Sequence, residues 1–123
     1  MTVLVDSDVL IEVTRARDAA TLEKWAELAE SDHVVLCTPV SVAELWRGAR
    51  PSEHRVFRDL FRALVCVPLD AETGTQAGEY LRAYHKSHGV ELGDALIAAA
   101  AVQHNATLWT RNRKHYPMDL AFY

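Results

Sequence analysis

Three acids and one amide lie at the ends of predicted strands or the starts of predicted helices, the positions from which side chains reach the ligand-binding edge of a parallel sheet. Asp6 ends an apolar run at 2–5 and Asn112 follows another at 106–110, whereas Glu44 and Asp94 open predicted helices. If the first and fourth strands are neighbours in a parallel sheet, all four converge at the ligand-binding edge. Clustered carboxylates repel one another, and hard oxygen ligands select Mg²⁺ or Mn²⁺. Such ions activate water and stabilise phosphoryl transition states, which predicts hydrolysis of a phosphate substrate.

Each of these residues also has a purely structural interpretation. Asp6 is a preferred residue type for capping the helix that follows it. Ser41 and Glu44 match the spacing of a capping box, and Asp94 complements the dipole of an apolar helix. Asn112 is a common turn former. The chemical interpretation therefore depends on the four residues coming together, because no single one of them requires it.

The elements that must position these residues alternate along the chain. Apolar strands followed by amphipathic or apolar helices are typical of a parallel sheet covered on both faces. We therefore expect an α/β fold in which a mostly parallel central sheet forms the middle of a three-layer α/β/α sandwich. Strands are expected at about 2–5, 33–38, 65–69, 106–110 and 120–122, and helices at about 9–15, 19–29, 41–48, 51–64, 71–87 and 95–102.

Bulk properties narrow the class of protein. A chain of 123 residues predicts a single domain, 1–123. Its net charge of −4 argues against a general nucleic-acid coat protein but not against a metal-assisted acidic site. No basic leader or membrane-length apolar run is visible, so we expect a cytoplasmic protein with no membrane partner. Cys37 and Cys66 lie in apolar runs and are expected to be reduced core residues.

Four short segments, in this order, resemble the motifs of the PIN-domain family and of its VapC-type toxins. They are VLVDSDVLI at 3–11, SVAEL at 41–45, GDALIAA at 93–99 and LWTRNRKHY at 108–116. The resemblance spans essentially the whole chain. It implies a PIN-like sandwich, ribonuclease activity that depends on Mg²⁺ with Mn²⁺ as a substitute, frequent homodimerisation, and neutralisation by a cognate antitoxin.

The same resemblance carries site roles onto Asp6, Glu44 and Asp94. One departure concerns the last motif, in which the family often has a fourth acid. The candidate positions here hold Asn112 and His115. Asn112 can hold an ion or a water through its carbonyl oxygen but adds no charge, so a second metal would bind more weakly.

The leading hypothesis is a toxin that is a metal-dependent endoribonuclease. Asp6 and Asp94 would bind the ion, Glu44 would orient water or complete the coordination shell, and Asn112 with Thr110 would support them. Two alternatives remain open: a catalytically silent PIN-like module that binds RNA or protein, and a metal-dependent hydrolase of another phosphate substrate.

Other surfaces are assigned to partners. Arg111, Arg113 and Lys114 either contact the RNA backbone or form a solvated loop. The surfaces near Trp25 and Trp46 could receive an apolar antitoxin helix. The two helices between the first and second strands could form a flap or a dimer surface.

Overall fold

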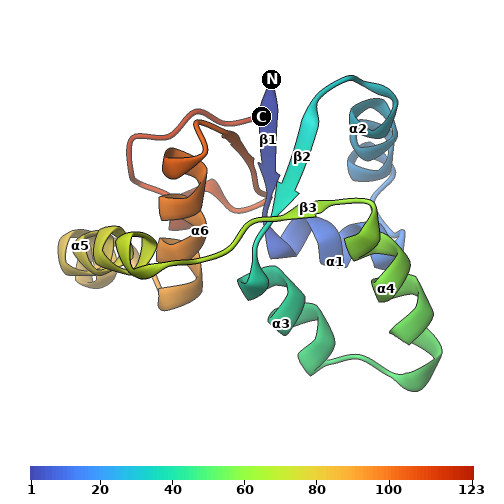
Figure 1. Cartoon of the computed structure of the whole chain (residues 1–123), viewed down its shortest axis with the longest axis horizontal. Coiled ribbons are helices and arrows are strands. Elements are labelled where there is room, and N and C mark those ends of the chain that lie inside the picture. The colour runs from blue at the N-terminus through green and yellow to red at the C-terminus, as the bar shows by residue number, and fades with distance from the viewer.

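The computed structural model describes all residues, 1–123, and contains one four-stranded parallel sheet (Figure 1). The strand order is β3-β2-β1-β4, which confirms the α/β class and places the first and fourth strands side by side. The register pairs Leu4 with Leu36 on one side and with Leu108 on the other. The strands are β1 (Thr2–Val5), β2 (Val34–Cys37), β3 (Val65–Cys66) and β4 (Thr107–Trp109).

Helices cover both faces of the sheet, as the three-layer prediction requires. In Figure 1, α5 and α6 lie on one side of the strands and α1–α4 on the other. None of these helices is both long and apolar enough to cross a lipid bilayer. The helices are α1 (Ser7–Arg15), α2 (Ala19–Glu30), α3 (Pro39–Arg47), α4 (His54–Arg62), α5 (Ala71–His88) and α6 (Leu92–Gln103), with 3₁₀ turns η1 (Pro51–Glu53) and η2 (Arg113–His115).

The alternation of side chains along each strand divides the core into two halves. Leu4, Leu36 and Leu108 pack toward the apolar helix α6. Val3 and Val5, their neighbours on β1, pack into the second cluster with α1 and α2. Because successive strand residues point to opposite faces, the apolar run at positions 3–5 of β1 is buried on both sides of the sheet.

Helix α3 begins earlier than the sequence suggested. Pro39 occupies its first turn and Thr38 is the N-cap residue, a position that suits proline because its missing N–H has no helical partner. The capping box predicted for Ser41 and Glu44 is therefore wrong. Both residues lie inside the helix, and their side chains are free to face the carboxyl edge of the sheet.

The edges of the sheet also differ from expectation. The third strand contains only Val65 and Cys66, both exposed, so Cys66 is not the core residue that was predicted. The fifth strand is reduced to a single parallel bridge between Leu108 and Phe122. Both segments lie at an edge, where one flank has no neighbouring strand to extend the pairing.

Candidate active site

Asp6 occupies the junction between β1 and α1, where its carboxylate caps the helix and also accepts hydrogen bonds from the C-terminal segment. As the N-cap residue, it accepts a 2.7 Å hydrogen bond from the backbone N–H of Ser7 through Oδ1. Its Oδ2 accepts hydrogen bonds from the Thr110 hydroxyl at 2.8 Å and the Tyr116 phenol at 2.9 Å. Residues from the first strand and from the C-terminal segment thus meet at one carboxylate.

Asp8 is the second acid of this group. Its Oδ2 accepts the Arg111 backbone N–H at 3.1 Å and lies 3.3 Å from the Thr110 hydroxyl oxygen. One hydroxyl carries a single proton, so Thr110 cannot donate to Asp6 and Asp8 at the same time. The remaining oxygen, Oδ1, is buried and has no hydrogen-bond partner. An unpaired buried carboxylate oxygen is costly unless it binds a cation.

Burial and mutual repulsion dominate the electrostatics of this pair. The pKa of Asp6 is raised from 3.8 to about 6, first by burial and then by the charge of Asp8, against the three hydrogen bonds it accepts. Burial also raises the pKa of Asp8, and the Arg111 N–H is the largest opposing effect. The pKa of the Tyr116 phenol is raised by burial and then by Asp6, with smaller effects from Asp94 and Asp8. Tyr116 therefore stays protonated and can serve only as a donor to Asp6.

Ser7 connects this group to Glu44. Its backbone N–H binds Asp6, while its hydroxyl donates to Glu44 Oε1 at 3.0 Å and lies 2.8 Å from the Ser41 hydroxyl. Ser7 and Ser41 are both buried, whereas Glu44 reaches the surface. A buried serine pair thus sets the direction of an exposed carboxylate that lies 37 positions further along the chain.

Asp94 lies across a cleft from this connection. It occupies the first turn of α6, where its Oδ2 accepts the Glu91 backbone N–H at 3.1 Å, so the capping role proposed for it is present. The same oxygen is 3.6 Å from Nδ1 of His115. Glu44, Asp94 and His115 line one cleft of about 600 Å³ together with Arg47. Gly93 belongs to the same wall, and a Cβ added there would lie 3.7 Å from Glu44 Oε1.

The predicted site residues therefore lie in two neighbouring groups. Asp6 belongs to the buried group with Asp8, and Glu44 and Asp94 belong to the cleft. Asn112 lies beside the buried group, where its backbone N–H donates to Thr110 Oγ1 at 3.1 Å. No hydrogen bond joins its amide side chain to the acids. Its support of the site thus passes through Thr110, which was predicted together with it.

The donor chemistry of the buried group fits a divalent cation. Asp6 and Asp8 offer oxygen atoms only, which suits a hard ion such as Mg²⁺ or Mn²⁺, and the unpaired Asp8 Oδ1 is an available ligand atom. No three His, Cys, Asp or Glu side chains gather closely enough to surround an ion by themselves. Mg²⁺ commonly keeps several waters and takes one or two protein carboxylates, which this pair can supply.

The loop after β4 holds the three basic residues that were expected either to contact the RNA backbone or to be solvated. The Arg111 guanidinium lies 3.8 Å from Glu12 and 3.6 Å from Asp18, so this side chain is engaged within the protein. Arg113 lies over the Phe122 ring at 4.7 Å. Lys114 is exposed and makes no ion pair, which leaves it available to a partner.

Sequence reasoning did not assign four residues to this site as functional side chains: Ser7, Asp8, Glu12 and Tyr116. Tyr116 is the last residue of the fourth motif and is not an acid, so nothing in its type indicated a bond to Asp6. Glu12 is an acid buried on α1, with a side chain only 4% exposed, between Arg17 and Arg111. Its position four residues after Asp8, on the same helical face, was the available signal.

The profile of the PIN domain matches residues 3–119. Ribonuclease VapC10 of Mycobacterium tuberculosis is 38% identical over 117 residues, which cover 94% of this chain and 86% of that protein. Ribonuclease VapC19 of the same organism is 31% identical, with coverage of 94% and 92%.

Solved structures agree on the fold. VapBC-1 from nontypeable Haemophilus influenzae superposes with a TM-score of 0.79 at 21% identity, over 100% of this chain and 97% of that one. FitAcB from Neisseria gonorrhoeae gives a TM-score of 0.74 at 25% identity, with coverage of 98% and 96%. Because the PIN domain profile matches residues 3–119 and a VapC ribonuclease is 38% identical over 94% of the chain, the chain belongs to the PIN domain family.

Proposed function

We propose that this protein is a metal-dependent endoribonuclease that serves as the toxin of a type II toxin–antitoxin pair. The names of the VapC10 and VapC19 ribonucleases support this proposal. One structural observation carries it furthest: the buried Asp6–Asp8 pair, with its unpaired oxygen, is joined through Ser7 to Glu44 at the carboxyl edge of the sheet. Burying the unpaired Asp8 oxygen costs free energy unless a cation binds it.

The proposed cofactor is Mg²⁺, which Mn²⁺ could replace. Asp6 and Asp8 would hold it, with Asp94 as the predicted further ligand from the cleft. When bound, the ion would supply Lewis acidity that activates water and neutralises charge on the phosphate. Tyr116 and Thr110 keep Asp6 oriented by donating to its Oδ2. Ser7 keeps Glu44 Oε1 directed toward the cleft, where this carboxylate can accept a proton from water.

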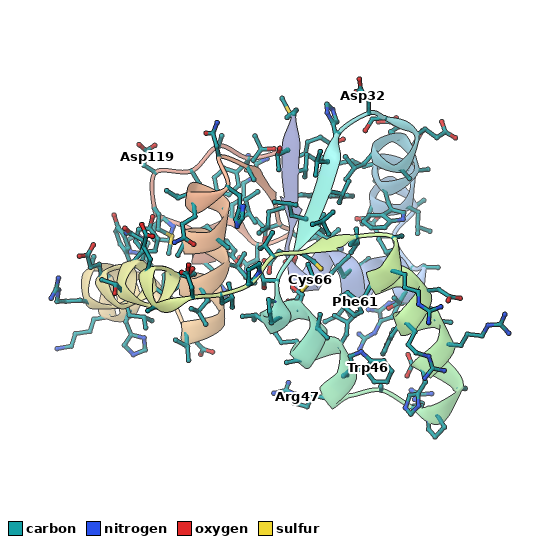
Figure 2. All side chains as sticks on the ribbon, in the orientation of Figure 1. Asp32, Trp46, Arg47, Phe61, Cys66 and Asp119 are labelled. Atoms are coloured by element: carbon teal, nitrogen blue, oxygen red, sulfur yellow. The ribbon has the colours of Figure 1, made fainter.

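The surroundings of Glu44 suggest a path for the RNA strand. Glu44 lines two hollows, the cleft with Arg47 and a second one of about 370 Å³ that also has Arg15 and Arg50 in its wall. Figure 2 shows Arg47 extending outward from the end of α3. A phosphate backbone that crosses Glu44 would meet a cation on each side, and such contacts position a strand without reading its sequence.

The proposed partner is a cognate antitoxin, together with a second copy of the toxin. An apolar hollow of about 380 Å³ lies between α2, β2, β3 and the residues after α4, and Trp25 and Leu28 contribute to its wall. A helix with apolar residues at regular spacing fits such a surface. We also propose that the chain acts as a single domain, in the cytoplasm, where RNA substrates are found.

Cleavage of a labelled RNA by the purified protein tests the proposal. Fragments should form in Mg²⁺ or Mn²⁺ and should disappear in chelator, and DNA of the same sequence should remain intact. Asp6→Asn should abolish the cleavage, whereas Glu23→Gln, on the exposed side of α2, should retain it. RNA that stays intact in the presence of either ion, yet is retained by the protein on a filter, would instead support a silent RNA-binding module.

A further inference from the structure

The two cysteines of the chain face each other across neighbouring strands. Cys37 and Cys66 are Cα partners in the parallel pairing of β2 with β3, and the Val67 N–H continues the ladder with a 2.9 Å bond to the Cys37 carbonyl. Paired strands lie about 4.8 Å apart, and disulfides span Cα separations of about 4.4–6.8 Å. Side chains at matched positions of a parallel pair point to the same face, so the two sulfur atoms are neighbours.

The thiols already interact in the reduced protein. The pKa of the Cys37 thiol is raised to about 12 by burial, by the charge of Cys66 and by a hydrogen bond with the Cys66 thiol. Cys37 is fully buried, whereas Cys66 is exposed on the edge strand. Figure 2 shows Cys66 near the centre of the molecule, where β3 passes the carboxyl end of β2. The pair therefore combines one accessible sulfur with one protected sulfur.

We propose that Cys37 and Cys66 form a reversible redox modification site that closes to an intramolecular disulfide on reaction with a small disulfide such as oxidised glutathione. The Cys66 thiolate attacks one sulfur of oxidised glutathione, which forms a mixed disulfide and releases one glutathione thiolate. Cys37 then gives its proton to solvent, and its sulfur attacks the sulfur of Cys66. This step releases the second glutathione, so the two protein thiols are oxidised and one disulfide is reduced to two thiols.

The environment assigns the order of these steps and makes them reversible. Only Cys66 is accessible to a solvent-borne oxidant, so it reacts first. Once Cys66 is a mixed disulfide, its charge no longer opposes ionisation of Cys37. The product would lie at an exposed sheet edge, and exposed disulfides are the readily reduced ones. A reducing compartment would therefore keep the pair open except under oxidative conditions.

The location gives the disulfide a structural consequence. It would close a ring from Cys37 to Cys66 that contains α3 and α4. Cys37 directly precedes Thr38, the N-cap of α3, and α3 carries Ser41 and Glu44. Cross-linking removes freedom mainly from the unfolded chain, so the oxidised protein should melt several degrees higher. The site is independent of the proposed ribonuclease activity and could form whether or not the protein cleaves RNA.

Mass spectrometry of the full chain tests this directly. The protein is equilibrated in a series of reduced-to-oxidised glutathione ratios, and its free thiols are then blocked with N-ethylmaleimide in denaturant, so that buried Cys37 also reacts. The intact mass and the peptides are then measured. We expect a monomer that has lost two hydrogen atoms, takes up no blocking reagent and yields a Cys37–Cys66 peptide. Dithiothreitol should restore two reactive thiols and lower the melting temperature again.

Two variants complete the test. Cys66→Ser, at an exposed position, should fold normally and resist both glutathione and the oxidative rise in melting temperature. Cys37→Ala should stop at the mixed disulfide on Cys66. Blocking of both wild-type thiols at every glutathione ratio would overturn the proposal. A lasting mixed disulfide on wild-type Cys66, or a dimer linked through Cys66, would also overturn it.

Discussion

The Tyr116 phenol donates a 2.9 Å hydrogen bond to Oδ2 of Asp6, a residue 110 positions earlier in the chain. This contact joins the C-terminal segment to the first strand at the most perturbed carboxylate of the site. Tyr116 is buried, and its phenol remains protonated because burial, and then the charge of Asp6, raise its pKa. Its function here is to favour the ionised form of Asp6.

Removing this donor should make ion binding more dependent on pH. Tyr116→Phe should raise the pKa of Asp6 further above 6, because a hydrogen bond to the charged form is lost. A cation requires ionised Asp6, so Mn²⁺ affinity should fall more at pH 6 than at pH 8. Titration calorimetry at both pH values measures the ratio. Tyr84→Phe, on α5, is the control, and an unchanged ratio in Tyr116→Phe would remove this role.

The Asp6–Asp8 pair should destabilise the ion-free protein near neutral pH. Because the pKa of Asp6 is raised in the folded state from 3.8 to about 6, its contribution to stability is full below pH 4 and is lost as pH rises through 6. The loss amounts to about 2–3 kcal/mol in the free energy of unfolding. Asp8→Asn removes the repelling charge and should return roughly 1 kcal/mol at pH 7.

Thermal melts in chelator and in millimolar Mn²⁺ measure this effect. In chelator, Asp8→Asn should melt higher than the wild type at pH 7 and equally at pH 4, where the acids are protonated. Its rise on adding Mn²⁺ should be smaller than that of the wild type, because an ion stabilises only the state that binds it. A variant that melts lower than the wild type at pH 7, with an undiminished Mn²⁺ effect, would contradict the proposed ion site.

Ser7 should act on the reaction by positioning Glu44. Ser7→Ala removes the 3.0 Å bond to Glu44 Oε1, and we expect kcat for RNA cleavage to fall roughly tenfold with little change in KM. Ser41→Ala is a matched control, since it deletes a buried hydroxyl from the same pair but retains the bond between Ser7 and Glu44. Equal losses in both variants would show that the serine pair matters for packing alone.

Arg111 should contribute to stability and not to RNA affinity. Its guanidinium faces Glu12 and Asp18, and Glu12 is nearly fully buried. Arg111→Ala should lower the free energy of unfolding by about 1–2 kcal/mol, a value reduced for the partial exposure of Arg111. Lys114→Ala should leave stability unchanged and weaken RNA binding at low salt. Melting curves measure stability, and filter binding in an Asp6→Asn background measures RNA affinity without cleavage. If Arg111→Ala weakened RNA binding without lowering stability, Arg111 would instead be part of the RNA-binding surface.

The sequence predicted those features that depend on local pattern and chain order. The convergence of Asp6 and Asn112 required the first and fourth strands to be neighbours in a parallel sheet, and β1 and β4 are neighbours. The start of α3 was misplaced because Pro39 can end a strand and open a helix equally well. The exposure of Cys66 could not be predicted, since an apolar pattern does not reveal that its strand lies at an edge with only two paired residues.

The site itself was only partly visible in the sequence. The acids were identified by residue type and position, but their distribution between a buried pair and an open cleft depends on side-chain packing. Tyr116 reaches Asp6 from the C-cap position of η2, and no periodicity in the sequence predicts that contact. The unpaired oxygen of Asp8 likewise follows from tertiary burial, which a linear pattern cannot show.

If the buried pair and the cleft act as one catalytic unit, the losses caused by variants of the two groups should not multiply. Initial rates of RNA cleavage in Mg²⁺ are compared for Asp6→Asn, Asp94→Asn and the double variant. Asp119→Asn is the control, on the outer loop labelled in Figure 2. We predict that each single variant lowers the rate of RNA cleavage at least about 100-fold. The rate of the double variant should be within about threefold of the rate of the less active single variant, because the effects of residues that act as one unit are not additive. Near-wild-type cleavage by either single variant, or a double loss equal to the product of the single losses, would contradict the account.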